Sequence, residues 1–108
     1  MTFPLQIKID DSEYSGLITP LPGCPDIAVS HALYLSNGQG GKGKEANKKR
    51  LKQLKKLGFS AVLCTIDNNN AKQKEILKTN NWIEIPNIYN RRTKHTISLY
   101  IKHLNIKT

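Results

Sequence analysis

A glycine-rich stretch that leads into a basic helix contains the residues best suited to bind a charged ligand. Residues 37–44 read NGQGGKGK and hold four of the seven glycines in the chain. Glycines let backbone N–H groups approach a phosphate closely, and the start of the following helix adds about half a positive charge there. Lys42 and Lys44 add two full charges. The stretch therefore predicts a site for a phosphate-bearing ligand.

Two common nucleotide-binding patterns can be traced in this stretch, and both are incomplete. Residues 38–45 match the P-loop pattern G-x-x-x-x-G-K-[ST] up to the last position. There Glu45 replaces the hydroxyl that holds Mg²⁺, and its carboxylate repels phosphates. The dinucleotide pattern G-x-G-x-x-G fits from Gly38 to Gly43, but the strands expected before it form a meander instead of a βαβ unit. Both patterns stay open as alternatives.

The third interpretation is a resemblance to a known family. Leu33-Tyr34-Leu35 ends an apolar segment, and GGKGKE at 40–45 follows after four residues and opens a helix. That helix ends at Leu57-Gly58-Phe59. From residue 27 to Trp82, the chain resembles the acetyl-CoA-binding core of the GNAT superfamily of N-acyltransferases, in which a strand is followed by R/Q-x-x-G-x-G/A. It is also similar to small GKGKEAN-type proteins of bacteriophages.

The resemblance implies acetyl-CoA as cofactor and transfer of its acetyl group to an amine acceptor, with the strand backbone polarising the thioester. It implies that the pantetheine arm of coenzyme A binds the backbone of the apolar strand and that the glycine loop binds the phosphates. The cofactor-binding residues predicted in this way are Leu33, Leu35, Gly40, Gly41, Lys42, Gly43, Lys44 and Asn70.

Three positions depart from the family's pattern. Gly40 replaces the family's Arg or Gln, and Glu45 replaces a small residue. Leu77 stands where many members carry a Tyr that protonates the departing thiolate. The chain also begins near the family's second strand, so the first strand and the helices that usually cover the acceptor site are not expected. Binding of the cofactor is therefore better supported than catalysis.

Two residues are candidate catalytic bases. His31 lies four residues before Leu35 and is expected on the same strand face as Leu33 and Leu35, where family members often carry Glu. A neutral imidazole there takes a proton from an acceptor amine; the alternative is a histidine that lines a half-buried sheet. Asp26 is the second candidate, with capping of a loop as its alternative.

Two cysteines, Cys24 and Cys64, match no metal-ligand spacing, so no metal site is expected.

The net charge of +9 is concentrated in the second part of the chain, with −3 over residues 1–41 and +12 over residues 42–108. Such asymmetry favours an anionic partner. The alternative function is therefore a catalytically inactive GNAT-like protein that binds nucleic acid or a host protein, and a nucleobase-modifying relative is a third. The candidates for contact with nucleic acid or another anion are Lys48, Lys49, Lys52, Arg91, Arg92 and Lys94.

Hydrophobic periodicity predicts the elements that position these residues. The expected order is β-β-β-α-β-α-β-β, an α/β (α+β) truncated GNAT-like fold with a mixed, mostly antiparallel sheet in one domain, residues 1–108. Residues 20–26, with three prolines, are expected to form a loop, and Arg50 to lie with the lysines on the solvent face of the first helix. The predicted strands are 3–9, 13–19, 27–36, 60–67, 82–89 and 95–104, and the predicted helices are 45–57 and 70–79.

The sequence also leads to expectations about location and assembly. Apolar runs are far shorter than the roughly 20 residues of a membrane-spanning helix, and the first residues lack the layout of a signal peptide. A soluble protein of the cytoplasm is expected, the host cytoplasm if a phage encodes it. The final strand, 95–104, is expected to be exposed and able to pair with a second copy in a homodimer.

Overall fold

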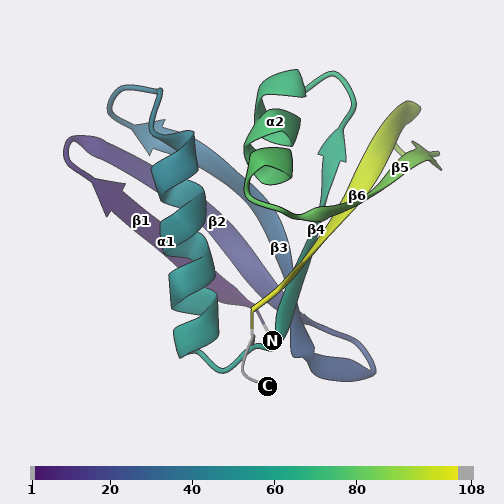
Figure 1. The fold of residues 1–108 in the computed structure, drawn as a ribbon, viewed down its shortest axis with the longest axis horizontal. Helices are drawn as coiled ribbons and strands as arrows, with labels where there is room; N and C mark the ends of the chain where they lie inside the picture. Colours follow the sequence, from purple (N-terminus) through teal and green to yellow (C-terminus); the bar gives the residue numbers. More distant parts are fainter. Residues whose placement is uncertain (1, 105–108) are drawn as a thin grey trace.

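The described residues, 2–104 of the computed structural model, form one mixed sheet covered by two helices (Figure 1). The strands lie in the order β1-β2-β3-β4-β6-β5. The element order β-β-β-α-β-α-β-β is the predicted one, so the predicted fold class is confirmed. The elements are β1 (Phe3–Ile9), β2 (Ser12–Leu21), β3 (Cys24–Asn37), α1 (Gly43–Lys56), β4 (Ala61–Asp67), α2 (Ala71–Thr79), β5 (Ile83–Asn90) and β6 (His95–His103).

The central feature of the sheet is the divergence of β3 and β4. These two strands are parallel and pair at only three positions, of which Val29 opposite Leu63 is the last. Every other pair of neighbouring strands is antiparallel. Beyond Val29 and Leu63 the two strands separate, and in Figure 1 they form a V that opens toward the glycine loop and α2.

Both helices lie on the same face of the sheet, in front of it in Figure 1. Helix α1 crosses β1 and β2, whose alternating residues Leu5, Ile7 and Ile18 are almost wholly buried beneath it. Helix α2 lies over the V, with Ile76 and Leu77 as its buried residues. Its start is fixed by Asn70, whose side chain accepts a hydrogen bond from the Gln73 N–H at 3.2 Å, as expected of an N-cap.

The buried face of α1 differs from the prediction at its most polar position. Arg50 was expected among the lysines in solvent, but its side chain is 2% exposed. Leu57, just beyond the helix, is 61% exposed. The stripe at helical spacing that faces the sheet is formed by Ala46, Asn47, Arg50 and Leu54.

Two further expectations about the sheet were wrong. The proline-rich segment is not a loop, because β2 runs to Leu21 and β3 begins at Cys24, with Gly23 at φ +84° in the turn. Strand β1 begins at Phe3, opposite Ile18, so the part of β2 beyond Ile18 lacks a second neighbour, and proline is tolerated there. The last strand is not exposed for pairing either, because β6 lies between β4 and β5.

Within residues 2–104, no helix has the length and apolar character to span a bilayer.

The glycine loop is anchored to the turn between β1 and β2, and this contact leads to a prediction. Gly38 has φ +98°, and a Cβ built there would lie 2.1 Å from the Asp11 carbonyl oxygen. Gly38→Ala should therefore destabilise the fold by about 2 kcal/mol or more, as measured by urea denaturation. Gly40→Ala is the matched control, because its nearest atom is Leu35 Cδ2 at 4.0 Å. Equal stability of the two variants would contradict this role of Gly38.

Candidate functional site

The V between β3 and β4 contains a cavity of about 280 Å³, here called the apex cavity. It begins where strand pairing ends, because Ser30 and Cys64 are the first residues beyond the last parallel pair. The pairing register of the two strands does not continue past Val29 and Leu63 in the described part of the chain. The apex cavity is lined by Ser30, Leu33, Tyr34, Arg50, Cys64, Thr65, Ile66, Asp67, Asn70 and Gln73.

A second cavity of about 240 Å³, here called the loop cavity, lies where the glycine loop meets α2. The two cavities share Leu33, Asn70 and Gln73 in their walls, so they are adjacent along the V. Six of the eight predicted cofactor-binding residues meet in the loop cavity, which is lined by Tyr14, Leu33, Leu35, Gly40, Gly41, Gly43, Asn70, Lys72, Gln73 and Ile76.

The two predicted lysines differ in how free they are to meet a ligand. Lys42 donates to the Asp10 carboxylate at 2.8 Å, and this contact raises the pKa of Lys42 and lowers that of Asp10. Its charge is thus already partly neutralised by β1–β2. Lys44 is exposed in the first turn of α1. Lys72, which sequence reasoning missed, lines the loop cavity from α2.

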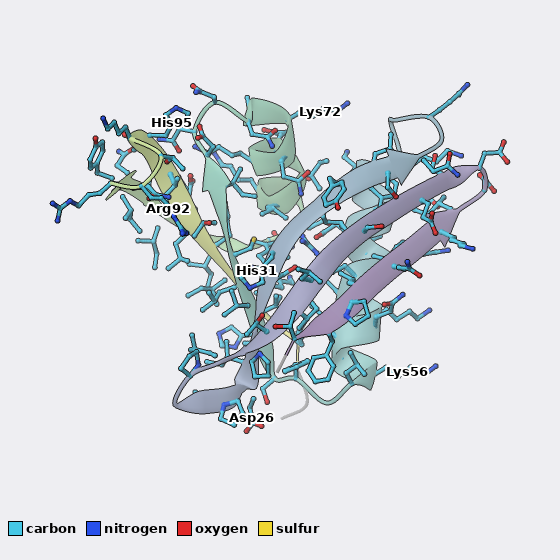
Figure 2. The ribbon with its side chains drawn as sticks, turned by 180° about the vertical axis from the view of Figure 1, so that it is seen from behind. Asp26, His31, Lys56, Lys72, Arg92 and His95 are labelled. Carbon is cyan, nitrogen blue, oxygen red and sulfur yellow. The ribbon has the colours of Figure 1, made fainter. Side chains whose placement is uncertain are left out.

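A bulge in β3 changes which face of the sheet its residues occupy. Leu17 pairs with His31 and Ser15 with Tyr34, so β3 has one residue more than β2 over this stretch. Strict alternation was expected to put His31 on one face with Leu33 and Leu35, and this was wrong. Leu33 packs against the core, and His31 lies on the opposite, uncovered face, as Figure 2 shows.

The uncovered face bears a hollow of about 280 Å³ beside His31, here called the rear hollow. His31 Nε2 lies 3.1 Å from Thr19 Oγ1, which orients the ring. Tyr34, 59% exposed, lines both the rear hollow and the apex cavity, so the two spaces adjoin at this side chain. The rear hollow is lined by Pro4, Leu5, Gln6, Ser15, Gly16, Leu17, His31 and Tyr34.

The other predicted residues lie away from these cavities. Asp26 is exposed near the closed end of the V, at the bottom of Figure 2, where its backbone oxygen accepts from the Ser60 N–H at 2.8 Å. Arg91, Arg92 and Lys94 lie in the turn between β5 and β6, far from α1. The predicted basic residues thus form two separate groups instead of one surface.

Arg50 is a site residue that sequence reasoning missed. Its guanidinium donates to Ser30 Oγ at 3.3 Å and to Asn47 Oδ1 at 2.7 Å, and its Cζ lies 5.3 Å from the centre of the Trp82 ring. Burial lowers the pKa of Arg50. Burial also raises the pKa of the neighbouring Cys64 thiol, to about 11. The only Arg in a run of lysines, at the spacing of the buried stripe, is the signal that could have identified it.

Comparison with known proteins identifies the fold. No protein-family model and no curated protein matches the sequence. Solved structures do match: the ribosomal-protein-S18-alanine N-acetyltransferase of Escherichia coli has a TM-score of 0.70 at 10% identity, over 99% of this chain and 72% of that one. An acetyltransferase of the GNAT family from Streptococcus pneumoniae gives 0.65 at 10%, over 96% and 67%.

A third match is a candidate acetyltransferase from Salmonella typhimurium, solved with its cofactor acetyl-CoA, with a TM-score of 0.66 at 11% identity over 91% of this chain and 60% of that one. Identities this low establish a shared fold and no more. The predicted GNAT-like fold is therefore confirmed, and its function is a separate question.

An Asp–His pair at the wide end of the V leads to a prediction about acid stability. Asp67 accepts from the Asn69 N–H at 2.9 Å and contacts His95 Nδ1 at 2.5 Å, and these contacts lower the pKa of Asp67 below 3.8. A lowered pKa stabilises the folded state above the unfolded-state value, and this stabilisation is lost as the pH falls through the lowered pKa. Asp67→Asn should therefore lower Tm at pH 7, and the difference from wild type should shrink below about pH 4. A pH-independent difference in Tm would contradict this role.

Proposed function

We propose that this protein binds an acyl-CoA thioester in the V between β3 and β4 and transfers its acyl group to an amine. The observation that carries the proposal is the position of the unpaired inner edges of β3 and β4 directly beside the glycine loop. Backbone N–H and C=O groups on such edges need partners. A pantetheine arm is extended and carries two amides, so it can pair with them as an added strand does.

The residues around the two cavities fit the rest of coenzyme A. Gly41, at φ +92°, leaves open space beside the backbone at the start of α1, where N–H groups and the helix dipole attract phosphates. Lys44 and Lys72 supply charge from the two helices. Glu45 opposes binding, and Lys42 contributes less because Asp10 holds it. The apolar Leu33 and Leu35 side chains line the path between the phosphates and the apex.

The acceptor amine is proposed to approach from the rear hollow. When His31 Nε2–H donates to Thr19 Oγ1, Nδ1 carries the lone pair that accepts the amine proton. The amine nitrogen then bonds to the thioester carbonyl carbon, the C–S bond breaks, and coenzyme A leaves as a thiolate. Leu77 is wholly buried and has no proton to give, so water protonates this thiolate. The place of action is proposed to be the cytoplasm, the host cytoplasm if a phage encodes the protein.

Acetyl-CoA and free CoA are expected to raise Tm by several degrees at fixed salt, whereas ATP, which lacks the pantetheine arm, raises it little. Lys72→Glu should weaken both CoA complexes by tenfold or more, because a charged hydrogen bond to phosphate contributes about 1.5–3 kcal/mol. Thermal unfolding checks the rise in Tm, and binding constants from isothermal titration calorimetry check the loss of affinity.

Lys56→Glu is the matched control, because it makes the same charge change at the far end of α1 (Figure 2). It should leave both affinities within about twofold after correction for the general loss of positive charge. No binding of either CoA species, or equal losses in the two variants, would overturn the proposed site.

A second candidate function follows from four lysines of α1. Lys49, Lys52, Lys55 and Lys56 line one surface hollow of about 490 Å³ together with Gln53. Such a basic surface suits the phosphate backbone of a nucleic acid, with no aromatic side chain in the hollow to stack on bases. This surface is separate from the V, so both functions can coexist in one molecule.

Nucleic-acid binding by this surface predicts a steep salt dependence. Neutralisation of about four phosphates on duplex DNA gives a slope near −3.6 for log K against log salt concentration. Replacing Lys52 and Lys55 by Gln should reduce the slope by about 2, as measured by fluorescence anisotropy. A slope near zero in the wild-type protein would exclude this candidate.

A further inference from the structure

The apex of the V contains a buried positive charge that no acidic group neutralises. The Arg50 side chain is 2% exposed and lines the apex cavity. Its two hydrogen-bond acceptors, on Ser30 and Asn47, are neutral. Within residues 2–104, no carboxylate oxygen lies within ion-pairing distance of it. The neighbouring Cys64 is a thiol at neutral pH, because its pKa is raised to about 11.

Buried hydrogen-bond donors packed around the Arg50 side chain also lack acceptors. The buried side-chain nitrogens without a hydrogen-bond partner in the described chain are Asn47 Nδ2, Arg50 Nε and Trp82 Nε1. All three are donors, and they belong to side chains that contact one another: Arg50 bonds Asn47 and lies over the Trp82 ring. Of these three side chains only Arg50 lines the apex cavity, so its guanidinium is the group there that an anion would satisfy. Asp67 also lines the cavity, but it is the last residue of β4, at the wide end of the V, and contacts His95.

Such an arrangement is costly in the absence of an anion. A buried ion carries a desolvation penalty of several kcal/mol that only a partner of opposite charge offsets. A methionine of similar length would fill the same space between α1, Ser30 and Trp82 without this penalty. A residue that lowers stability and lines the proposed site is typical of a group retained for ligand binding.

The position of Arg50 decides what the anion belongs to. The CoA phosphates are expected at the loop cavity, and Arg50 lies at the closed end of the V, next to Ser30 and Cys64. A ligand that enters along β3 reaches this end with its acyl group. We propose that the acyl donor carries a terminal carboxylate, of the succinyl-CoA or malonyl-CoA class, and that Arg50 binds this carboxylate. The proposal rests on the proposed function and specifies its substrate class.

The carboxylate could also belong to a separate small acid bound beside an acetyl thioester, and the two sources can be separated. Calorimetry on the full chain would compare CoA, acetyl-CoA, succinyl-CoA, and acetyl-CoA in the presence of succinate. We expect succinyl-CoA to bind at least tenfold more tightly than acetyl-CoA, and succinate to leave the affinity for acetyl-CoA unchanged. If free succinate strengthened the binding of acetyl-CoA as much as the succinyl group strengthens the binding of CoA, the assignment of the carboxylate to the acyl chain would be overturned.

Arg50→Met tests whether Arg50 is the group responsible. The variant should lose the preference for succinyl-CoA over acetyl-CoA and have a Tm equal to or above that of the wild-type apoprotein. Lys55→Met, an exposed position on the same helix, is the control and should keep the preference. If Arg50→Met is misfolded, Arg50→Lys gives the second measurement, with a reduced preference expected from a single ammonium group.

The outcomes separate this inference from the proposed function. If no CoA species binds, the proposed function fails. If CoA and acetyl-CoA bind and succinyl-CoA is no better in the wild-type protein, the carboxylate inference alone fails. A preference that persists in Arg50→Met overturns the role of Arg50.

Discussion

The divergence of β3 and β4 is the constraint on which the rest of the structure depends. Three parallel pairs hold the strands together at one end, and each is held on its outer side by an antiparallel neighbour, β2 or β6. The strands cannot separate further at the closed end or pair again at the open end. The V therefore keeps two backbone edges available, with α2 above it and the glycine loop at its mouth. The apex and loop cavities, the proposed cofactor path and the buried Arg50 all lie along this one opening.

The element order and most of the loop cavity could be predicted from the sequence, because they depend on local signals. Alternation gave β1 as Phe3–Ile9 without error, and α2 begins beside Asn70, a residue type that is favoured as an N-cap. The glycine loop brought its residues together because a strand that ends near Leu35 and a helix that starts at Gly43 are fixed by nearby sequence. Such signals act within a few residues and do not depend on tertiary packing.

The features that the sequence did not reveal depend on contacts between distant strands. The bulge in β3 moves His31 to the rear face, and only the pairing of β2 with β3 shows it. The interior place of β6 depends in the same way on its pairing with both β4 and β5. Arg50 was misplaced for another reason: charged residues are almost never fully buried without a partner, so composition favoured the solvent face. A violation of such a rule is expected at a functional site.

The central claim is that the V between β3 and β4 receives the extended arm of coenzyme A. Chemical-shift mapping of the ¹⁵N-labelled protein tests it most directly, because each backbone amide reports its own surroundings. Titration with CoA should shift the amides of Leu33, Leu35, Gly41 and Asn70 most, and leave those of Lys55 and Arg92 nearly unchanged. Shifts confined to the lysine-rich face of α1, or no shifts at all, would contradict the account.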